Sequence, residues 1–127
     1  MFITRLTGAE GREMKSGNYV PDRGDIVWLT FNPQAGHEQA GRRPALCLSP
    51  KKYNEKTSLG IFVLITSKAK GYPFEVPVKG KRISGVILSD QVRNLDWRVR
   101  KADFIEKCSP EVLEETMEKL KLILGIE

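Results

Sequence analysis

Residues His37–Pro50 read "HEQAGRRPALCLSP", and they contain an abrupt change from polar to apolar character. The segment begins with acid, amide and glycine residues, reaches the paired arginines Arg42 and Arg43, and continues as a short apolar run. Glycines and polar residues favour a loop, whereas a short apolar run bounded by turn residues favours a buried strand. The stretch therefore predicts a loop over residues 32–41 that leads into a strand over residues 43–49.

Further strands are predicted on both sides of this stretch. Residues rich in β-branched and aromatic side chains, separated by Gly, Pro and Asn, mark short strands. Prolines in the segment around residues 74–78 suit an edge strand, because proline cannot donate a ladder hydrogen bond. A short helical turn is expected within residues 49–60. The predicted strands are 26–31, 43–49, 61–67, 74–78 and 85–97, with one more short strand within 99–109.

The C-terminal segment changes to a helical period. Ser109 is a suitable N-cap, Pro110 suits the first helical position, and Gly125 suits the C-terminal stop. Leu113, Met117, Leu120 and Leu124 recur at a spacing that places them on one helical face. Five or six short strands followed by one amphipathic helix predict a mainly β fold with α, in which a small, strongly bent sheet or barrel is capped by a helix.

Length and composition are those of one globular domain. The chain has 127 residues, of which 40% are apolar and 29% charged, and no apolar run is long enough to span a membrane. Residues 1–18 are expected to be a disordered leader and residues 19–127 a single domain, with the start at Met1 or Met14 left open. Cys47 and Cys108 are expected to be reduced core residues in the cytoplasm. The net charge of +5 permits an acidic partner such as nucleic acid.

Known catalytic motifs are absent from the sequence. A single histidine, His37, excludes a ribonuclease that uses two histidines and argues against a structural zinc site. No nucleophile elbow, HExxH motif or phosphate-binding Walker loop is present. If strands 43–49 and 61–67 pair antiparallel, Arg43 and Thr66 lie at the same edge, where a guanidinium and a hydroxyl can bind a phosphate. An ordinary solvated loop and strand end remain the alternative.

Three blocks of the sequence resemble the MazF/PemK family of toxin endoribonucleases. These blocks are "YVPDRGDIVWLTFNPQAGHEQAGRRPALCLSP", "KGYPFEV" and "GVILSDQVRNLDWR", and the likeness covers residues 19–125. The resemblance implies an SH3-like β-barrel of five to seven short strands with a C-terminal helix, working as a cytoplasmic homodimer. It also implies metal-independent, sequence-specific cleavage of single-stranded RNA, chiefly messenger RNA, without a cofactor. A MazE-like antitoxin, whose C-terminal tail covers the RNA site, is the implied partner.

The resemblance also implies roles for individual residues. The family's catalytic arginine falls on Arg43, its catalytic threonine on Thr66, and the glutamate of the same loop on Glu38. The implied chemistry is attack by the substrate's own 2′-OH, which leaves a 2′,3′-cyclic phosphate and a 5′-OH. His37 is expected to be exposed and not catalytic. Candidate RNA-binding residues are Asn32, Gln39, Ser67, Lys68, Lys70, Gln91 and Arg100.

Several alternatives stay open at this stage. Tyr72 and Phe74 are candidates for stacking on bases, although core or edge packing is favoured for Phe74. Trp28 and Trp97 are expected in the core or at a dimer interface. A non-catalytic RNA-binding barrel, a protein that only sequesters an antitoxin, and a gyrase-poisoning toxin of the same fold are the rival functions. The recognised bases, the antitoxin and the general base are left open.

Overall fold

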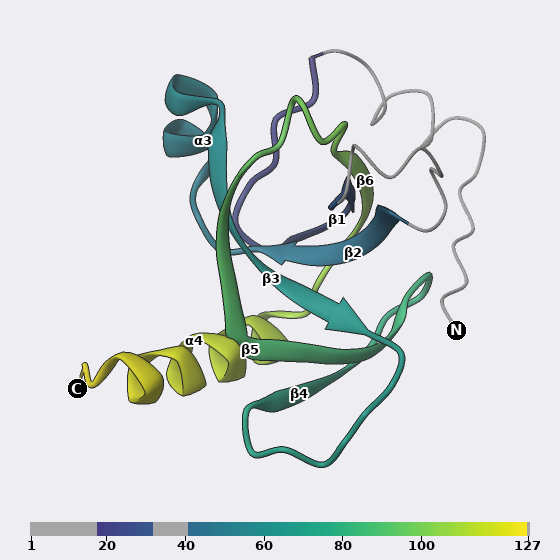
Figure 1. Ribbon diagram of the computed structural model, residues 1–127, viewed down its shortest axis with the longest axis vertical. Coiled ribbons are helices and arrows are strands. Elements are labelled where there is room, and N and C mark those ends of the chain that lie inside the picture. The colour runs from purple at the N-terminus through teal and green to yellow at the C-terminus, as the bar shows by residue number, and fades with distance from the viewer. Residues whose placement is uncertain (1–17, 32–40, 127) are drawn as a thin grey trace.

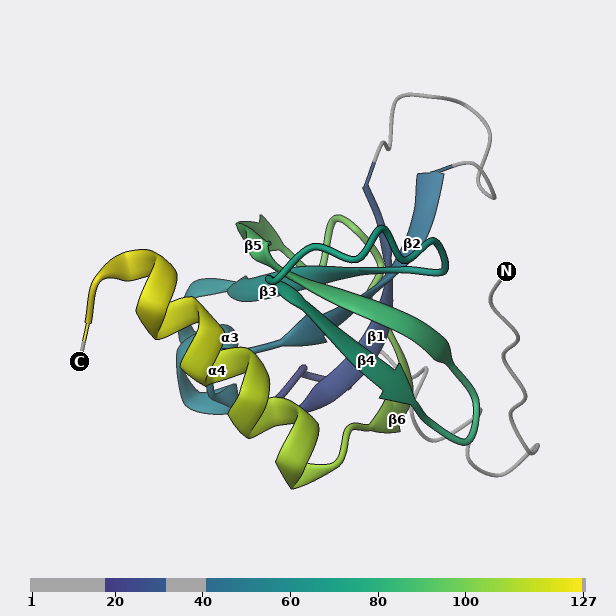
Figure 2. The ribbon, with the colours of Figure 1, turned by 90° about the horizontal axis from the view of Figure 1, so that it is seen from below.

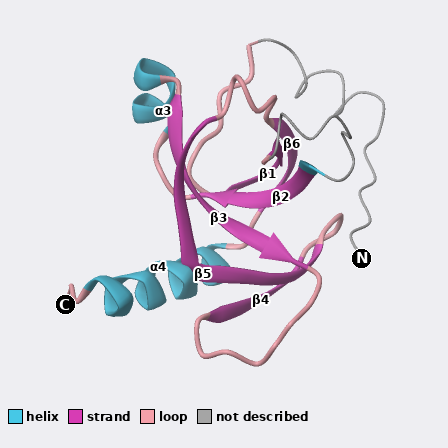
Figure 3. Cartoon of the chain, in the orientation of Figure 1, coloured by secondary structure: helices cyan, strands magenta, loops and turns pink. Residues whose placement is uncertain are grey.

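The computed structural model describes residues 18–31 and 41–126, and the predictions for the leader, Asn32, His37, Glu38 and Gln39 lie outside these ranges. One curled antiparallel sheet and two helices make up the described fold (Figures 1 and 3). The strand order across the sheet is β4-β5-β3-β2-β1-β6. The elements, in chain order, are β1 (Asp25–Thr30), β2 (Arg42–Cys47), α3 (Lys51–Thr57), β3 (Leu59–Thr66), β4 (Glu75–Lys79), β5 (Ser84–Asp96), β6 (Asp103–Lys107) and α4 (Pro110–Leu124).

The predicted mainly β architecture with a C-terminal helix is confirmed. Each predicted strand is present with ends shifted by a few residues, and β4, which contains Pro77, lies at one edge of the sheet. The expected helical turn is the seven-residue helix α3. The strand predicted over 43–49 ends at Cys47. Leu48 still donates its N–H to the Ile61 carbonyl of β3, but the Ile61 N–H donates to the Ser49 hydroxyl, which in turn bonds Asn54 in α3.

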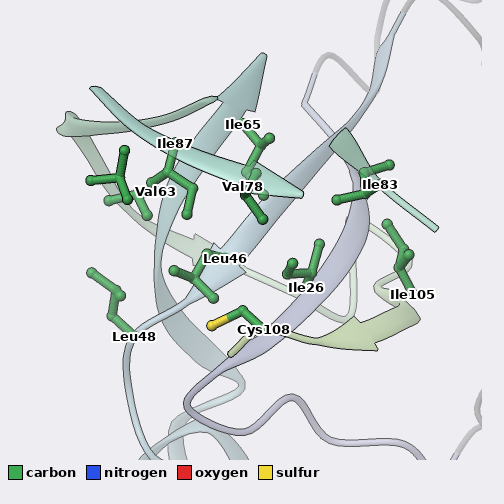
Figure 4. Close-up of a cluster of buried hydrophobic side chains, with 11 residues drawn as sticks. Ile26, Leu46, Leu48, Val63, Ile65, Val78, Ile83, Ile87, Ile105 and Cys108 are labelled. Carbon is green, nitrogen blue, oxygen red and sulfur yellow. The ribbon is translucent and has the colours of Figure 1, made fainter. Parts of the chain in front are cut away.

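Apolar side chains of the strands form two clusters, one on each face of the sheet. Residues of one strand alternate between the faces, so that Leu46 belongs to the first cluster and Ala45 and Cys47 to the second. Figure 4 shows the first cluster, which α4 covers. The second cluster contains Trp97, whose indole N–H donates to the carbonyl of Asn54. Of the core or dimer-interface positions predicted for the tryptophans, Trp97 lies in the core, and Trp28 is half-buried against the first cluster.

Helix α4 begins and ends where the sequence predicts. The Ser109 hydroxyl accepts the N–H of Val112, and Gly125 ends the helix in a left-handed conformation with φ of 74°. Leu113, Met117 and Leu120 pack on the first cluster, but Leu124 is 61% exposed. The expected apolar face is therefore wrong at its last member, because the end of the helix projects past the edge of the sheet (Figure 2).

A shift of register bends β5 sharply. The residue opposite Leu64 of β3 is Leu88, whereas the residue opposite the neighbouring Val63 is Val92. Residues 89–91 are therefore extra residues on β5, and such a bulge bends and twists a strand. Figure 1 shows β5 turning at this point from one half of the curled sheet to the other. The bulge carries the exposed side chain of Gln91.

A single carboxylate joins the two edges of the curled sheet. Glu106 of β6 is buried, with 8% of the residue exposed. Its carboxylate accepts the N–H groups of Lys81, Arg82 and Ile83. These three residues lie in the turn between β4 and β5, and β4 and β6 are the two edge strands. Gly80 begins the same turn, and a β-carbon there would overlap the Glu106 carboxylate. Glu106 therefore supplies the polar closure that a continuous strand ladder would give to a complete barrel.

Candidate active site at the ends of β2 and β3

Arg43 and Thr66 lie at the same end of the β2–β3 pair. The two strands are antiparallel and pair Ala45 with Leu64, Leu46 with Val63 and Cys47 with Phe62. The ladder ends at the Ala45–Leu64 pair, and Arg43 and Thr66 each lie two residues beyond it on their own strand. Side chains two residues apart on a strand share a face, so both lie on the face that bears Ala45 and Leu64. The predicted antiparallel pairing is therefore confirmed.

Arg42 is occupied by structural contacts. Its Nη1 atom donates to Thr30 Oγ1 at 2.8 Å and to the carbonyls of Arg100 and Lys101 at 3.2 and 3.0 Å. Its Nη2 atom lies 3.0 Å from Asp103 Oδ2 and forms an ion pair with it. Arg42 therefore ties β2 to the turn that precedes β6. This role is not visible in the sequence, because Arg42 and Asp103 are 61 residues apart and no local pattern links them.

Arg43 points to the opposite face from Arg42 and is exposed. Its side chain makes no hydrogen bond or ion pair with any other residue in the ranges that the structure describes. A guanidinium cannot lose its charge near neutral pH and offers five N–H donors in a planar fork. Arg43 is therefore an available cation at the end of a rigid strand.

Thr66 is half-buried at the end of β3 and begins a loop over residues 67–74. Its hydroxyl oxygen accepts the N–H of Lys68 at 3.3 Å, which leaves the hydroxyl hydrogen able to donate. Ser67 is half-buried, and Lys68 and Lys70 are exposed. The loop therefore adds positive charge and hydroxyl groups on the chain that leaves Thr66.

The remaining candidate residues occupy different surroundings. Gln91 is exposed on the β5 bulge. Arg100 is half-buried, and its Nη1 atom donates to the carbonyls of Thr30 and Phe31 at 3.0 Å each, so it organises the chain just before residue 32. Asn32, Glu38 and Gln39 lie outside the described residues. The structure thus places Arg43 near the start of β2 and Thr66 at the end of the neighbouring β3, and Ser67 and Lys68 follow Thr66 along the chain.

The two cysteines do not belong to this edge of the sheet. Cys47 and Cys108 are free and buried, as predicted, and burial raises the pKa of each thiol to about 11. A pocket of about 400 Å³ lies in the seam between β4 and β6, away from Arg43 and Thr66. Within residues 18–31 and 41–126, no three His, Cys, Asp or Glu side chains are grouped so as to hold a metal ion. No helix in those ranges is both long and apolar enough to cross a membrane.

The arrangement at this edge suits binding of a phosphodiester. A guanidinium donates to phosphate oxygens through parallel N–H groups, and a hydroxyl at its side adds a further donor. Both groups stand at the ends of strands, which hold a reactive group more firmly than a loop tip does. Fixed donors of this kind stabilise negative charge that develops on phosphate oxygens during a reaction.

Comparisons with known proteins agree on one family. Residues 22–124 match the model of the PemK-like, MazF-like toxin of type II toxin–antitoxin systems. The chain is 46% identical over 107 residues to the endoribonuclease toxin MazF of Escherichia coli, covering 84% of this chain and 96% of that protein. It is 37% identical over 109 residues to the endoribonuclease toxin ChpB of Escherichia coli, covering 81% of this chain and 93% of that one.

Solved structures show the same likeness. MazF from Deinococcus radiodurans superimposes with a TM-score of 0.78 at 53% identity, covering 86% of this chain and all of that one (100%). A MazE–MazF complex from the same organism gives a TM-score of 0.78 at 46% identity, covering 87% and 100% of the two chains.

Proposed function

This chain belongs to the PemK-like, MazF-like family of type II toxins, and we propose that it is an endoribonuclease that cuts single-stranded RNA at short sequences and so inhibits translation and growth. The observation that carries the proposal is the contrast between two adjacent arginines. Arg42 is held by Asp103 and by backbone carbonyls, whereas Arg43 is exposed at the end of the β2–β3 pair where Thr66 also lies. A strand end at which one guanidinium has no partner among the described residues, with a hydroxyl at the same end, supports binding and cleavage of a phosphodiester.

In the proposed reaction, the substrate's own 2′-OH attacks the adjacent phosphorus. The new bond joins the 2′-oxygen to phosphorus, the bond to the 5′-oxygen breaks, and the products are a 2′,3′-cyclic phosphate and a 5′-OH. A base removes the 2′-OH proton, and the departing 5′-oxygen takes up a proton. Negative charge gathers on the non-bridging oxygens, where Arg43 and Thr66 donate hydrogen bonds. Removing one such donor typically lowers the rate about 10²- to 10³-fold.

Glu38 is proposed to assist or position the proton transfer. Arg43 is a poor general base, because a guanidinium is a donor with no lone pair that accepts a proton. The carboxylate of Glu38 accepts protons far more readily near neutral pH. Glu38 lies five residues before Arg43, in the segment that joins β1 to β2. This placement in the chain supports its role beside the reacting phosphate.

RNA binding is proposed to extend on both sides of the cleaved phosphate. Lys68 and Lys70 are exposed cations that suit phosphate contacts. Gln91 presents an amide that can pair with a base edge, and Arg100 can offer the nitrogens that its backbone contacts leave unused. Asn32, Gln39 and Ser67 complete the proposed RNA-binding set.

The proposed assembly includes a second copy of the chain and an antitoxin. We propose a homodimer in the cytoplasm, formed by a single toxin domain of residues 19–127 that follows a leader of residues 1–18. A MazE-like antitoxin would inhibit it by laying a C-terminal tail over the RNA site. The MazE–MazF complexes among the solved structures support this partner. The reaction as written uses no metal or cofactor.

The direct test is cleavage of a long single-stranded RNA by the purified protein in the presence of EDTA. The expected result is a set of discrete cuts whose upstream fragments end in a 2′,3′-cyclic phosphate. A DNA strand of the same sequence should stay intact, because it lacks the 2′-OH. Absence of cutting in EDTA that returns with Mg²⁺, or equal cutting of the DNA strand, would contradict the mechanism. Inhibition of gyrase supercoiling without RNA cleavage would instead favour the gyrase-poisoning toxin.

A further inference from the structure

The loop over residues 67–74 covers the same face of the sheet as Arg43 and Thr66. Leu64 of β3 lies opposite Leu88 of β5, and Leu88 lies opposite Glu75 of β4, so these three side chains share one face. Thr66 is two residues from Leu64 and therefore lies on that face too. Figure 2 shows the loop between β3 and β4 on the opposite side of the sheet from α4.

Hydrogen bonds from β4 and β5 hold this loop in one conformation. The buried carboxylate of Glu75 accepts the N–H groups of Lys70 and Gly71 at 2.9 and 3.0 Å. The N–H of Glu75 donates in return to the carbonyl of Tyr72 at 3.1 Å, and the N–H of Ser89 donates to the carbonyl of Phe74 at 3.2 Å. Gly71 allows the turn through its positive φ of 79°.

Two aromatic side chains project from this pinned loop. Tyr72 is 57% exposed and Phe74 is 39% exposed. Of the core or edge packing predicted for Phe74, the core is excluded, and the residue directly precedes the edge strand β4. Lys68 and Lys70 are exposed on the same loop. Aromatic rings beside cations are the usual combination by which proteins hold single-stranded nucleic acid, since bases stack on the rings and cations contact phosphates.

We propose that Tyr72 and Phe74 form a base-stacking subsite for nucleotides that flank the cleaved phosphate. The inference rests on the proposed function, because it takes single-stranded RNA as the ligand. Stacking tolerates any base, since every base has an aromatic face. The subsite therefore contributes affinity and holds the strand, while hydrogen-bonding side chains choose the sequence. Glu75 is a positioning residue, because it acts on the RNA only through the loop that it holds.

The test measures binding separately from cleavage. The probe is a fluorescein-labelled 12-nucleotide 2′-O-methyl RNA of random sequence, which cannot be cut by 2′-OH attack, and its Kd is measured by anisotropy. Tyr72→Ala should raise the Kd about 5- to 100-fold, and Phe74→Ala should have a similar effect. Tyr72→Phe and Tyr72→Trp should stay close to wild type, whereas Tyr72→Leu should resemble the alanine variant. In cleavage assays, the loss should be larger in KM than in kcat.

Two controls make the test specific. Leu122→Ala removes a comparably exposed apolar side chain from α4, with 78% of Leu122 exposed, and should leave the Kd unchanged. Glu75→Gln keeps the side-chain shape but replaces one carboxylate oxygen with an amide N–H, which cannot accept a hydrogen bond from Lys70 or Gly71. It should therefore raise the Kd although both aromatic rings are still present. The mass of each variant in solution is measured alongside binding.

The outcomes distinguish failure of the stacking subsite from failure of the proposed endoribonuclease. Wild-type affinity in Tyr72→Ala and Phe74→Ala, with RNA cleavage intact, would overturn the stacking subsite and leave the endoribonuclease standing. Weakened binding in these variants of a protein that cuts no RNA would keep the subsite and remove the proposed enzyme. A change of oligomeric mass in Tyr72→Ala would show that the ring packs between two copies of the chain, which would also overturn the subsite.

Discussion

Arg42 and Arg43 differ in role because successive residues of a strand point to opposite faces. Arg42 reaches Thr30 and Asp103, and its side chain in that ion pair is only 22% exposed. Arg43 is exposed at the end of the β2–β3 pair where Thr66 also lies. The sequence alone gives two cations at the mouth of a strand. Only the fold decides which is structural, because the partners of Arg42 come from segments far away in the chain.

Substitution of each arginine by alanine should separate stability from activity. Arg42→Ala removes the ion pair with Asp103 and leaves its carbonyl partners unsatisfied, so it should lower the free energy of unfolding by about 1–3 kcal/mol. Arg43→Ala breaks no contact with a described residue and should change it by less than about 0.5 kcal/mol. Urea unfolding of both variants checks this, and an equal loss in the two would contradict the assignment.

Two buried groups that lose a proton at alkaline pH, a thiol and a tyrosine hydroxyl, predict how the free energy of unfolding changes above neutral pH. Burial raises the pKa of the Cys47 thiol from 9.0 to about 11. Burial, and next the Asp25 carboxylate that accepts its hydroxyl at 2.7 Å, raise the pKa of Tyr19 above its ordinary value of 10.0. Both pKa values are higher in the folded than in the unfolded chain. Their contribution to stability is therefore complete below pH 9 and falls as the pH rises above it.

The free energy of unfolding should fall by about 1–3 kcal/mol between pH 9 and pH 11 through Cys47 alone. Urea unfolding at each pH measures it, and Cys47→Ala should flatten the decline. A steady or rising stability over that range would show that the thiol is not shielded from water.

At the scale of elements, the sequence predicts what local patterns encode. The cap, proline and glycine of α4 define that helix, and the prolines around β4 define an edge strand. The β5 bulge was not predicted, since residues 89–91 read as an ordinary part of a long strand. The closure by Glu106 was not predicted either, because it depends on a turn more than 20 residues earlier, as the separations of 23 to 25 residues show.

That closure makes a prediction for the turn after β4. Gly80→Ala places a β-carbon against the Glu106 carboxylate and should cost about 1–3 kcal/mol. Glu106→Gln turns one acceptor into a donor that faces backbone N–H groups and should cost about 2–3 kcal/mol. Glu114→Gln, an exposed change on α4, is the matched control and should cost less than about 0.5 kcal/mol. Thermal unfolding measures the stability of all three variants. An equal loss of stability in Glu114→Gln, Gly80→Ala and Glu106→Gln would contradict the closure by Glu106.

At the scale of the whole molecule, one face of the sheet forms the main core and the other carries the candidate active site. One face carries the larger cluster beneath α4, and the other carries Arg43, Thr66 and the loop over residues 67–74. The antiparallel pairing of β2 with β3 was predictable from sequence, and it alone brings the two proposed catalytic residues together. Whether Phe74 packs in the core or at the edge was not predictable from sequence, because its exposure depends on how the loop over residues 67–74 folds back on β4.

The central claim is that Arg43 acts on the phosphate being cut. The most direct measurement is the single-turnover rate of RNA cleavage in EDTA, with saturating protein, for the wild type, Arg43→Ala and Arg43→Lys. We predict that Arg43→Ala lowers this rate at least about 10²-fold while its unfolding curve matches that of the wild type. Lysine should restore only part of the rate, because it lacks the planar pair of donors. Cleavage by Arg43→Ala at the wild-type rate would contradict the account.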